Sequence, residues 1–117
     1  MHNFKELKIW NNSMDLAVEV YRLTNKFPSE EKFNLVSQLR RSAVSIPSNI
    51  AEGAGRNHNK EFNQFLGIAR GSSFELETQL ILSSRISFLK NEQFNELNGS
   101  ITEIQRMISG FQSKLMS

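Results

Sequence analysis

The sequence of 117 residues contains no cysteine. Disulfides, thiol nucleophiles and zinc–thiolate sites are therefore excluded, and this composition fits the reducing cytosol. Aspartate occurs once, as Asp15, and histidine twice, as His2 in a terminus that we expect to fray and His58 in a polar connection. These residues do not supply a nucleophile, a base and an orienting group, so we expect no enzymatic activity.

Long apolar runs are also missing. No stretch approaches the roughly 20 apolar residues of a membrane span, and residues 1–5 lack the apolar core of a signal peptide. We therefore expect a cytoplasmic protein that has no membrane partner.

The motifs that hold phosphates or metals are absent as well. No GxxxxGK[ST] or GxGxxG pattern follows a strand, and residues 53–55 (Gly-Ala-Gly) are more typical of a helix end than of a phosphate loop. The Glu-x-x-His pairs of di-iron helical bundles do not occur, and Glu75 and Glu77 are too close in sequence to share a helix face. We expect no cofactor, no metal and no small-molecule substrate.

Proline is scarce, with two residues in the whole chain, and no Asn-Gly or Asp-Gly turn joins alternating apolar runs. The chain therefore divides into long segments that have helical periodicity. The first segment ends at Pro28 and carries two apolar rows at spacings of three and four residues. The rows are Trp10, Met14, Ala17 and Tyr21, and Leu16, Val20, Leu23 and Phe27.

The second segment begins at Ser29, a candidate N-cap that acidic residues follow, and ends at residues 53–55. Pro47 removes a backbone donor in its middle and predicts a kink. The apolar stripe is Val36, Leu39, Ala43, Ile46 and Ile50.

The third and fourth segments begin at the candidate caps Asn59 and Asn91. In the third, the small residues 71–73 indicate a place where another helix crosses, and the residues after Leu80 are apolar on all sides, which predicts burial all round. The fourth has the 3.5-residue repeat of knobs-into-holes packing. We predict an all-α, antiparallel, up-and-down four-helix bundle that is kinked near Pro47 and forms a single domain over residues 1–117.

Charge indicates a nucleic-acid role only weakly. The net charge is +2, and the first 60 residues hold nine Lys/Arg against six Asp/Glu. Basic residues gather around the second segment and the connection after it, where they are candidate phosphate contacts. The alternative is scattered solvating charge with one or two ion pairs. The candidates are Arg40, Arg41, Arg56, Lys60 and Arg70.

A polar stripe lies opposite the apolar stripe of the second segment. It is either a solvated face or a hydrogen-bonding surface for another subunit or a ligand. A pair between Arg40 and Glu77 across two helices is a further hypothesis, and such a pair fixes register more than it adds stability. The stripe is Gln38, Arg41, Ser45, Asn49 and Glu52; the candidate polar contacts of a subunit or of the fold are Gln38, Asn49, Glu52 and Glu77.

Two long motifs carry a family resemblance. Residues 38–53 (QLRRSAVSIPSNIAEG) and residues 65–72 (FLGIARGS), with the glutamates and leucines of residues 75–80, resemble the four-helix-bundle proteins named after intervening sequences in bacterial 23S ribosomal RNA genes. The resemblance covers nearly the whole chain. It implies a ring-shaped homopentamer without known catalysis. Similar proteins accompany the reverse transcriptases of diversity-generating retroelements, where they bind nucleic acid and the enzyme.

The leading hypothesis is therefore a non-enzymatic, homo-oligomeric assembly module that binds RNA or a nucleic-acid-processing protein through basic surface residues. The alternative is a protein-interaction adaptor without nucleic-acid affinity. A hydrolase or transferase is the third reading, and it requires a cluster of carboxylates or histidines that the helical spacing does not produce.

Overall fold

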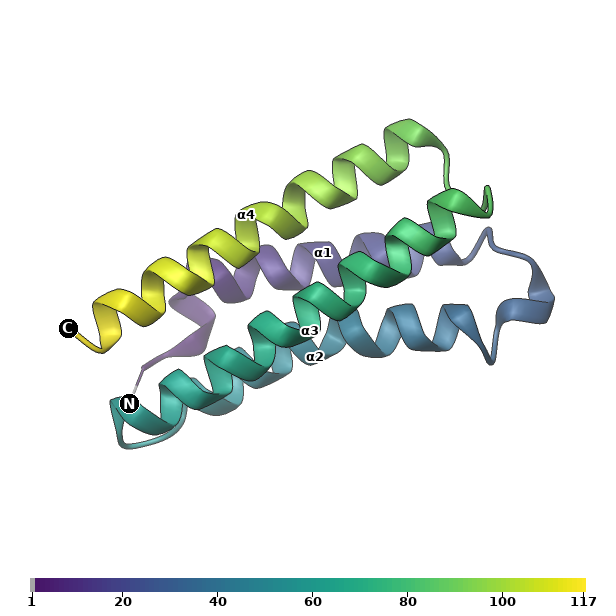
Figure 1. Ribbon diagram of the computed structural model, residues 1–117. Coiled ribbons are helices and arrows are strands. Elements are labelled where there is room, and N and C mark those ends of the chain that lie inside the picture. Colours follow the sequence, from purple (N-terminus) through teal and green to yellow (C-terminus); the bar gives the residue numbers. More distant parts are fainter. Residues whose placement is uncertain (1) are drawn as a thin grey trace.

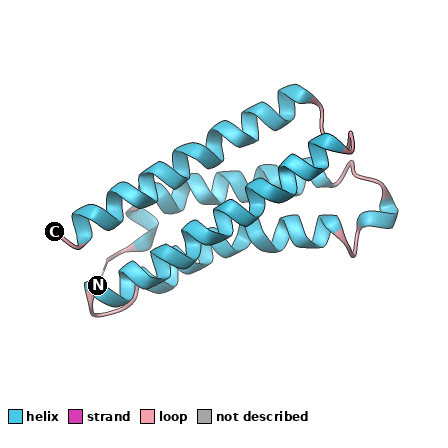
Figure 2. Ribbon diagram, in the orientation of Figure 1, coloured by secondary structure: helices cyan, strands magenta, loops and turns pink. Residues whose placement is uncertain are grey.

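The computed structural model describes residues 2–117, which contain helices and no strand. Successive long helices run in opposite directions and lie side by side in a rod of 44 × 23 × 20 Å (Figures 1 and 2). The predicted all-α, up-and-down four-helix bundle is confirmed. The helices are α1 (Lys8–Thr24), α2 (Leu35–Ala54), α3 (Asn59–Arg85) and α4 (Asn91–Leu115), with short 3₁₀ turns η1 (Phe4–Glu6) and η2 (Ser29–Glu31).

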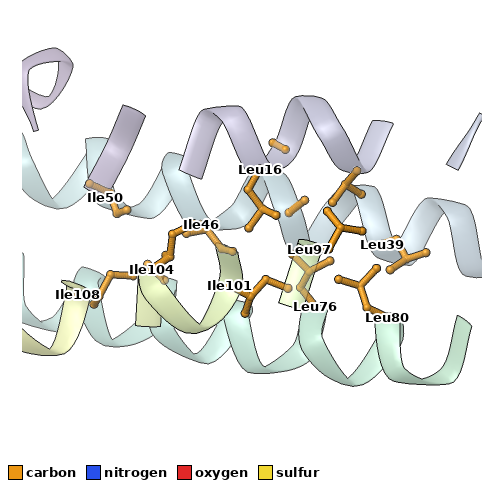
Figure 3. Packing of buried hydrophobic residues seen from close by; sticks show 14 of the residues in the cluster. Leu16, Leu39, Ile46, Ile50, Leu76, Leu80, Leu97, Ile101, Ile104 and Ile108 are labelled. Carbon is orange, nitrogen blue, oxygen red and sulfur yellow. The ribbon is translucent and has the colours of Figure 1, made fainter. Parts of the chain in front are cut away.

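Aliphatic side chains from all four helices form one core (Figure 3). The predicted α4 repeat faces inward, because Leu97, Ile101, Ile104 and Ile108 are all buried. Burying one such side chain contributes about 1.5–3 kcal/mol, so packing rather than helix propensity stabilises the fold. The apolar spacing in the sequence therefore predicted most residues of this core correctly.

The three predicted helix caps are wrong. Ser29 begins only the short turn η2, because residues 29–34 bury no side chain that would hold them in α-helix, and α2 starts after Asn34. The N-cap of α3 is His58; Asn59 is already helical, and its side chain donates to the carbonyl of Leu115 at 3.3 Å. The N-cap of α4 is Lys90, whose backbone N–H donates to Gln93 Oε1 at 3.0 Å.

The two apolar rows of α1 have different surroundings. The row that begins at Leu16 is buried, whereas Met14 and Tyr21 of the other row are 39% and 43% exposed. The terminus before this helix is held rather than frayed: the N–H of His2 donates to the carbonyl of Ala54 at 2.9 Å, and its ring lies 5.1 Å from that of Phe62. The side of α1 that carries Met14 and Tyr21 thus remains uncovered, although the N-terminal segment is anchored to α2.

The breakers of α2 have different roles. The helix continues through the buried Pro47, and the kink expected there stays a prediction. The predicted end at residues 53–55 is confirmed, because the helix runs to Ala54 and Gly55 is its C-cap. Gly53 is buried where α2 meets α3: a Cβ atom there would lie 2.7 Å from Phe65 Cβ and 2.8 Å from Phe62 Cδ1. The glycine permits the close approach of the two helices.

The prediction that α3 is buried all round after Leu80 is wrong for the single chain. Leu82 and Ile86 are 49% and 45% exposed. The small residues in its middle are only partly covered, because Ser72 contacts α2 whereas a Cβ at Gly71 would have open space. Within residues 2–117, no helix combines the length and apolar character that crossing a membrane requires.

Candidate functional site

An apolar groove runs between α1 and α2. It has a volume of about 640 Å³, and Val18 at its rim is 64% exposed. The rings of Phe4 and Trp10 pack edge to face, 5.1 Å apart, at its α1 end. The groove exists because the Trp10 row of α1 has no helix over it. Its lining is Phe4, Trp10, Met14, Ala17, Val18, Tyr21, Val44, Pro47, Ser48 and Ala51.

A basic groove of about 610 Å³ continues this surface, since Tyr21 and Val44 line both. Phe33 projects from it, 85% exposed, with Lys32 Nζ 5.5 Å from the centre of its ring. Arg41 is exposed on the same groove. In such an arrangement the cations can contact a phosphate while the open aromatic ring stacks on a base.

Arg40 lines the basic groove but is held by α1. Its Nε donates to Thr24 Oγ1 at 3.0 Å and its Nη2 to Asn25 Oδ1 at 2.9 Å, with the guanidinium 4.5 Å from the centre of the Tyr21 ring. Glu77 instead accepts from Gln105 Nε2 at 3.1 Å. The proposed pair of Arg40 and Glu77 is therefore wrong, because Arg40 faces α1 and Glu77 faces α4.

The polar stripe of α2 lies partly against α3. The hydroxyls of Ser45 and Ser72 are 2.8 Å apart, and Asn49 Nδ2 donates back to the Ser45 carbonyl at 2.8 Å. The neighbouring Ser42 hydroxyl contacts Glu75 Oε1 and Gln79 Oε1 at 3.0 and 2.9 Å.

The sequence analysis did not predict these hydrogen bonds between α2 and α3. A signal was present, because residues 42, 45 and 49 and residues 72, 75 and 79 share the same spacing of three and four, which places each set on one helix face. The ends of the stripe remain in solvent: Gln38 is exposed, and Glu52 pairs with Arg56 at 3.2 Å.

The candidate nucleic-acid residues do not form one patch. Arg40 and Arg41 share the basic groove, whereas Arg56 and the exposed Lys60 lie at the connection of α2 and α3, with the Arg56 guanidinium 4.8 Å from the centre of the Phe65 ring. Arg70 lines a third region between α3 and α4. Fourteen residues of helix, about 21 Å along the axis, separate Arg40 from the end of α2 at Ala54, and Arg56 follows in the connection.

The groove between α1 and α4 is acidic and small, about 190 Å³. Asp15, Glu19, Glu96 and Glu103 line it. A hydrogen bond from Arg22 to the Glu19 carboxylate holds the pKa of Glu19 below its usual value and raises the pKa of Arg22. Across residues 2–117, no three acidic, histidine or cysteine side chains converge as metal ligands would.

Exposed apolar residues also lie on α3 and at its C-cap. Ile68 and Leu82 of α3 and the C-cap residue Ile86 are 52%, 49% and 45% exposed. We call these three residues the α3 ridge. The sequence analysis expected apolar residues on all sides of the third segment after Leu80, whereas the apolar groove lies between α1 and α2.

Comparisons with known proteins agree with this architecture. A crystal structure of a protein with unknown function from the S23 ribosomal protein family of Bacteroides thetaiotaomicron is similar, with a TM-score of 0.80 and 27% identity over 89% of this chain and 97% of that chain. No curated protein sequence matches. The family model described as 23S rRNA-intervening sequence protein matches residues 5–110. Because that match covers most of the chain, the protein belongs to the 23S rRNA-intervening sequence protein family.

Proposed function

We propose that this protein is a non-enzymatic module whose first function is to assemble with copies of itself. The apolar groove between α1 and α2 supports the proposal most strongly. Contiguous apolar surface that is rimmed by polar residues is typical of protein interfaces, because solvent exposure of such a patch costs free energy that association recovers. Trp10, Tyr21 and Met14 are also residue types that interface centres favour.

The occupant of the groove is the α3 ridge of a second copy. The groove is concave, the side chains of the ridge are exposed and apolar, and the two surfaces lie on different helices. Contact between two different surfaces of identical chains is heterologous, and such contacts close into rings when the rotation permits. The homopentamer that the family resemblance implies is a ring of this kind.

Mass in solution, measured by light scattering, tests the assembly. We expect a multiple of the chain mass of 13.4 kDa. Val18→Glu in the groove and Leu82→Glu on the ridge should each reduce the mass to that of one chain, because each buries a carboxylate against apolar surface. Both side chains are exposed in the single chain, so circular dichroism should show an intact helical fold.

The matched control is Asn95→Glu, which adds the same charge at an exposed position of α4 outside both surfaces. It should leave the mass unchanged. A wild-type protein of 13.4 kDa, or variants that assemble as the wild type does, would contradict the proposal.

Binding of single-stranded RNA at the basic groove is the second candidate function. Lys32, Arg41 and the open ring of Phe33 favour it, because a backbone phosphate and a stacked base require these two kinds of group side by side. The competing adaptor function needs only the apolar groove. RNA affinity measured across a salt series distinguishes them, since phosphate contacts make affinity fall with salt.

A further inference from the structure

A further groove lies between α3 and α4 and has a volume of about 470 Å³. Two arginines, Arg70 from α3 and Arg106 from α4, line it, and none of the residues that line it is acidic. Like charges placed together without a carboxylate between them repel each other. An anion in the groove would remove that repulsion.

Arg70 lacks a hydrogen-bond partner at a position where one is needed. Its Nε is buried and has no hydrogen-bond acceptor. Among the buried side-chain nitrogens and oxygens of residues 2–117, no other atom lacks a hydrogen-bond partner. The guanidinium lies 5.5 Å from the centre of the Phe74 ring, which also lines the groove. A buried N–H without an acceptor destabilises a folded protein by about 1–3 kcal/mol. An acceptor that binds to this N–H would therefore gain binding free energy, because it satisfies the unpaired donor.

Two serine hydroxyls of the groove are available as donors. Ser109 and Ser113 lie one turn apart on α4, and within residues 2–117 neither hydroxyl makes a hydrogen bond. Thr102 and Gln105 are already engaged, by the Asn98 carbonyl and by Glu77. Because Gln105 holds the carboxylate of Glu77 beside the groove, an anion fits best in the part between the two arginines and the two serines.

We propose that this groove is a phosphate-binding site. Two oxygens of one phosphate can accept hydrogen bonds from the Nε and an Nη of the Arg70 guanidinium. A rotation about the last bonds of the Arg70 side chain turns this edge of the guanidinium towards the groove. Arg106 neutralises the remaining charge, and the serine hydroxyls donate to the other oxygens. The phosphate belongs either to a free phosphorylated molecule or to a nucleic-acid backbone. This site does not include the apolar groove, so phosphate binding does not require the proposed assembly.

Titration of the ¹⁵N-labelled protein with inorganic phosphate tests the site, with the Nε–Hε signal of Arg70 as the direct readout. We expect that signal and the Ser109 and Ser113 amides to shift and to saturate. Arg106→Gln should weaken phosphate binding about tenfold or more, because it removes a charge-assisted hydrogen bond. Arg106 is exposed, so its substitution leaves the fold intact.

Arg85→Gln is the control, since it removes an equal charge at an exposed position of α3 outside the groove. Equal weakening by both variants, or an Arg70 signal that does not respond to phosphate, would overturn the proposal. A parallel titration with a short oligonucleotide that lacks terminal phosphates separates the sources. If it shifts the same signals, the site binds a nucleic-acid backbone; if phosphate alone shifts them, the site binds a free phosphorylated molecule.

Discussion

At the scale of single residues, Gly53 shows how one missing side chain shapes the bundle. The space where its Cβ would lie is already occupied by Phe62 and Phe65 of α3. The Phe62 ring has little room to move away, because it is buried against His2 and Phe111, and the Phe65 atom in question is a Cβ fixed to the backbone of α3. The glycine therefore costs some helix propensity in α2 but permits a close contact between α2 and α3.

We predict that Gly53→Ala destabilises the protein by about 1–3 kcal/mol, since it overpacks the contact between α2 and α3. Urea unfolding followed by circular dichroism measures the change. Gly99→Ala is the matched control: nothing lies within 4 Å of a Cβ at that exposed helical position, so it should stabilise by about 0.5–1 kcal/mol. Equal effects of the two substitutions would show that the close approach does not matter.

At the scale of helices, the four contacts of the bundle differ in chemistry. The contact of α2 with α3 is the most extensive and includes the hydrogen bonds of Ser45 with Ser72, whereas that of α1 with α4 is the smallest among the four. Asp15 and Glu19 on α1 face Glu96 and Glu103 on α4 across their groove. Repulsion among these carboxylates opposes a closer approach, and Arg22 offsets part of it.

The ion pair of Arg22 and Glu19 predicts a dependence of stability on pH. Because Arg22 lowers the pKa of Glu19 in the folded protein, the pair stabilises the fold above the usual glutamate pKa of 4.5 and loses that effect as the pH falls through the lowered value. Arg22→Gln should therefore lower the melting temperature at pH 7, more at low salt than at high salt, and the deficit should shrink in acid.

Thermal unfolding of both proteins from neutral to acid pH measures this difference. Arg85→Gln, which removes a charge from an exposed site at the end of α3, should show no comparable dependence. A deficit of Arg22→Gln that grows as the pH falls would contradict the assigned direction. The pair is largely exposed, so the effect will be smaller than that of Gly53→Ala.

At the scale of the whole molecule, grooves of different character lie on different sides. The apolar and basic grooves are continuous along α1 and α2, the acidic groove lies between α1 and α4, and the arginine groove lies between α3 and α4. A net charge of +2 therefore conceals a strongly divided surface. A polyanion such as RNA would be attracted to the basic and arginine grooves and repelled by the acidic groove.

For RNA binding at the basic groove, we predict that the double substitution of Lys32 and Arg41 by Glu weakens affinity for single-stranded RNA. Two phosphate contacts are lost, so the slope of log affinity against log salt should become shallower by about 1.4. The matched control is the double substitution of Arg56 and Lys60 by Glu, which changes charge equally at the connection of α2 and α3. Equal weakening would locate binding outside the groove.

Much of the fold was predictable from the sequence because it depends on local periodicity. The apolar rows of Leu16, Leu39 and Ile104 recur at three and four residues, and such rows can be buried only in helices that face one another. The two motifs of residues 38–53 and 65–72 likewise identified the family. Capping was less predictable, because Ser29, Asn59 and Asn91 satisfy the local rule equally well without being caps.

The sequence by itself determined the helices, their inward faces and the family, since each depends on residues near one another along the chain. Only the tertiary structure decided which apolar residues stay exposed, which partner Arg40 takes, and that Arg70 and Arg106 share a groove. Those features depend on the side of each helix that a neighbour covers. Helical spacing states that a face is apolar or charged, but the rotation of one helix against the next determines whether that face meets protein or solvent.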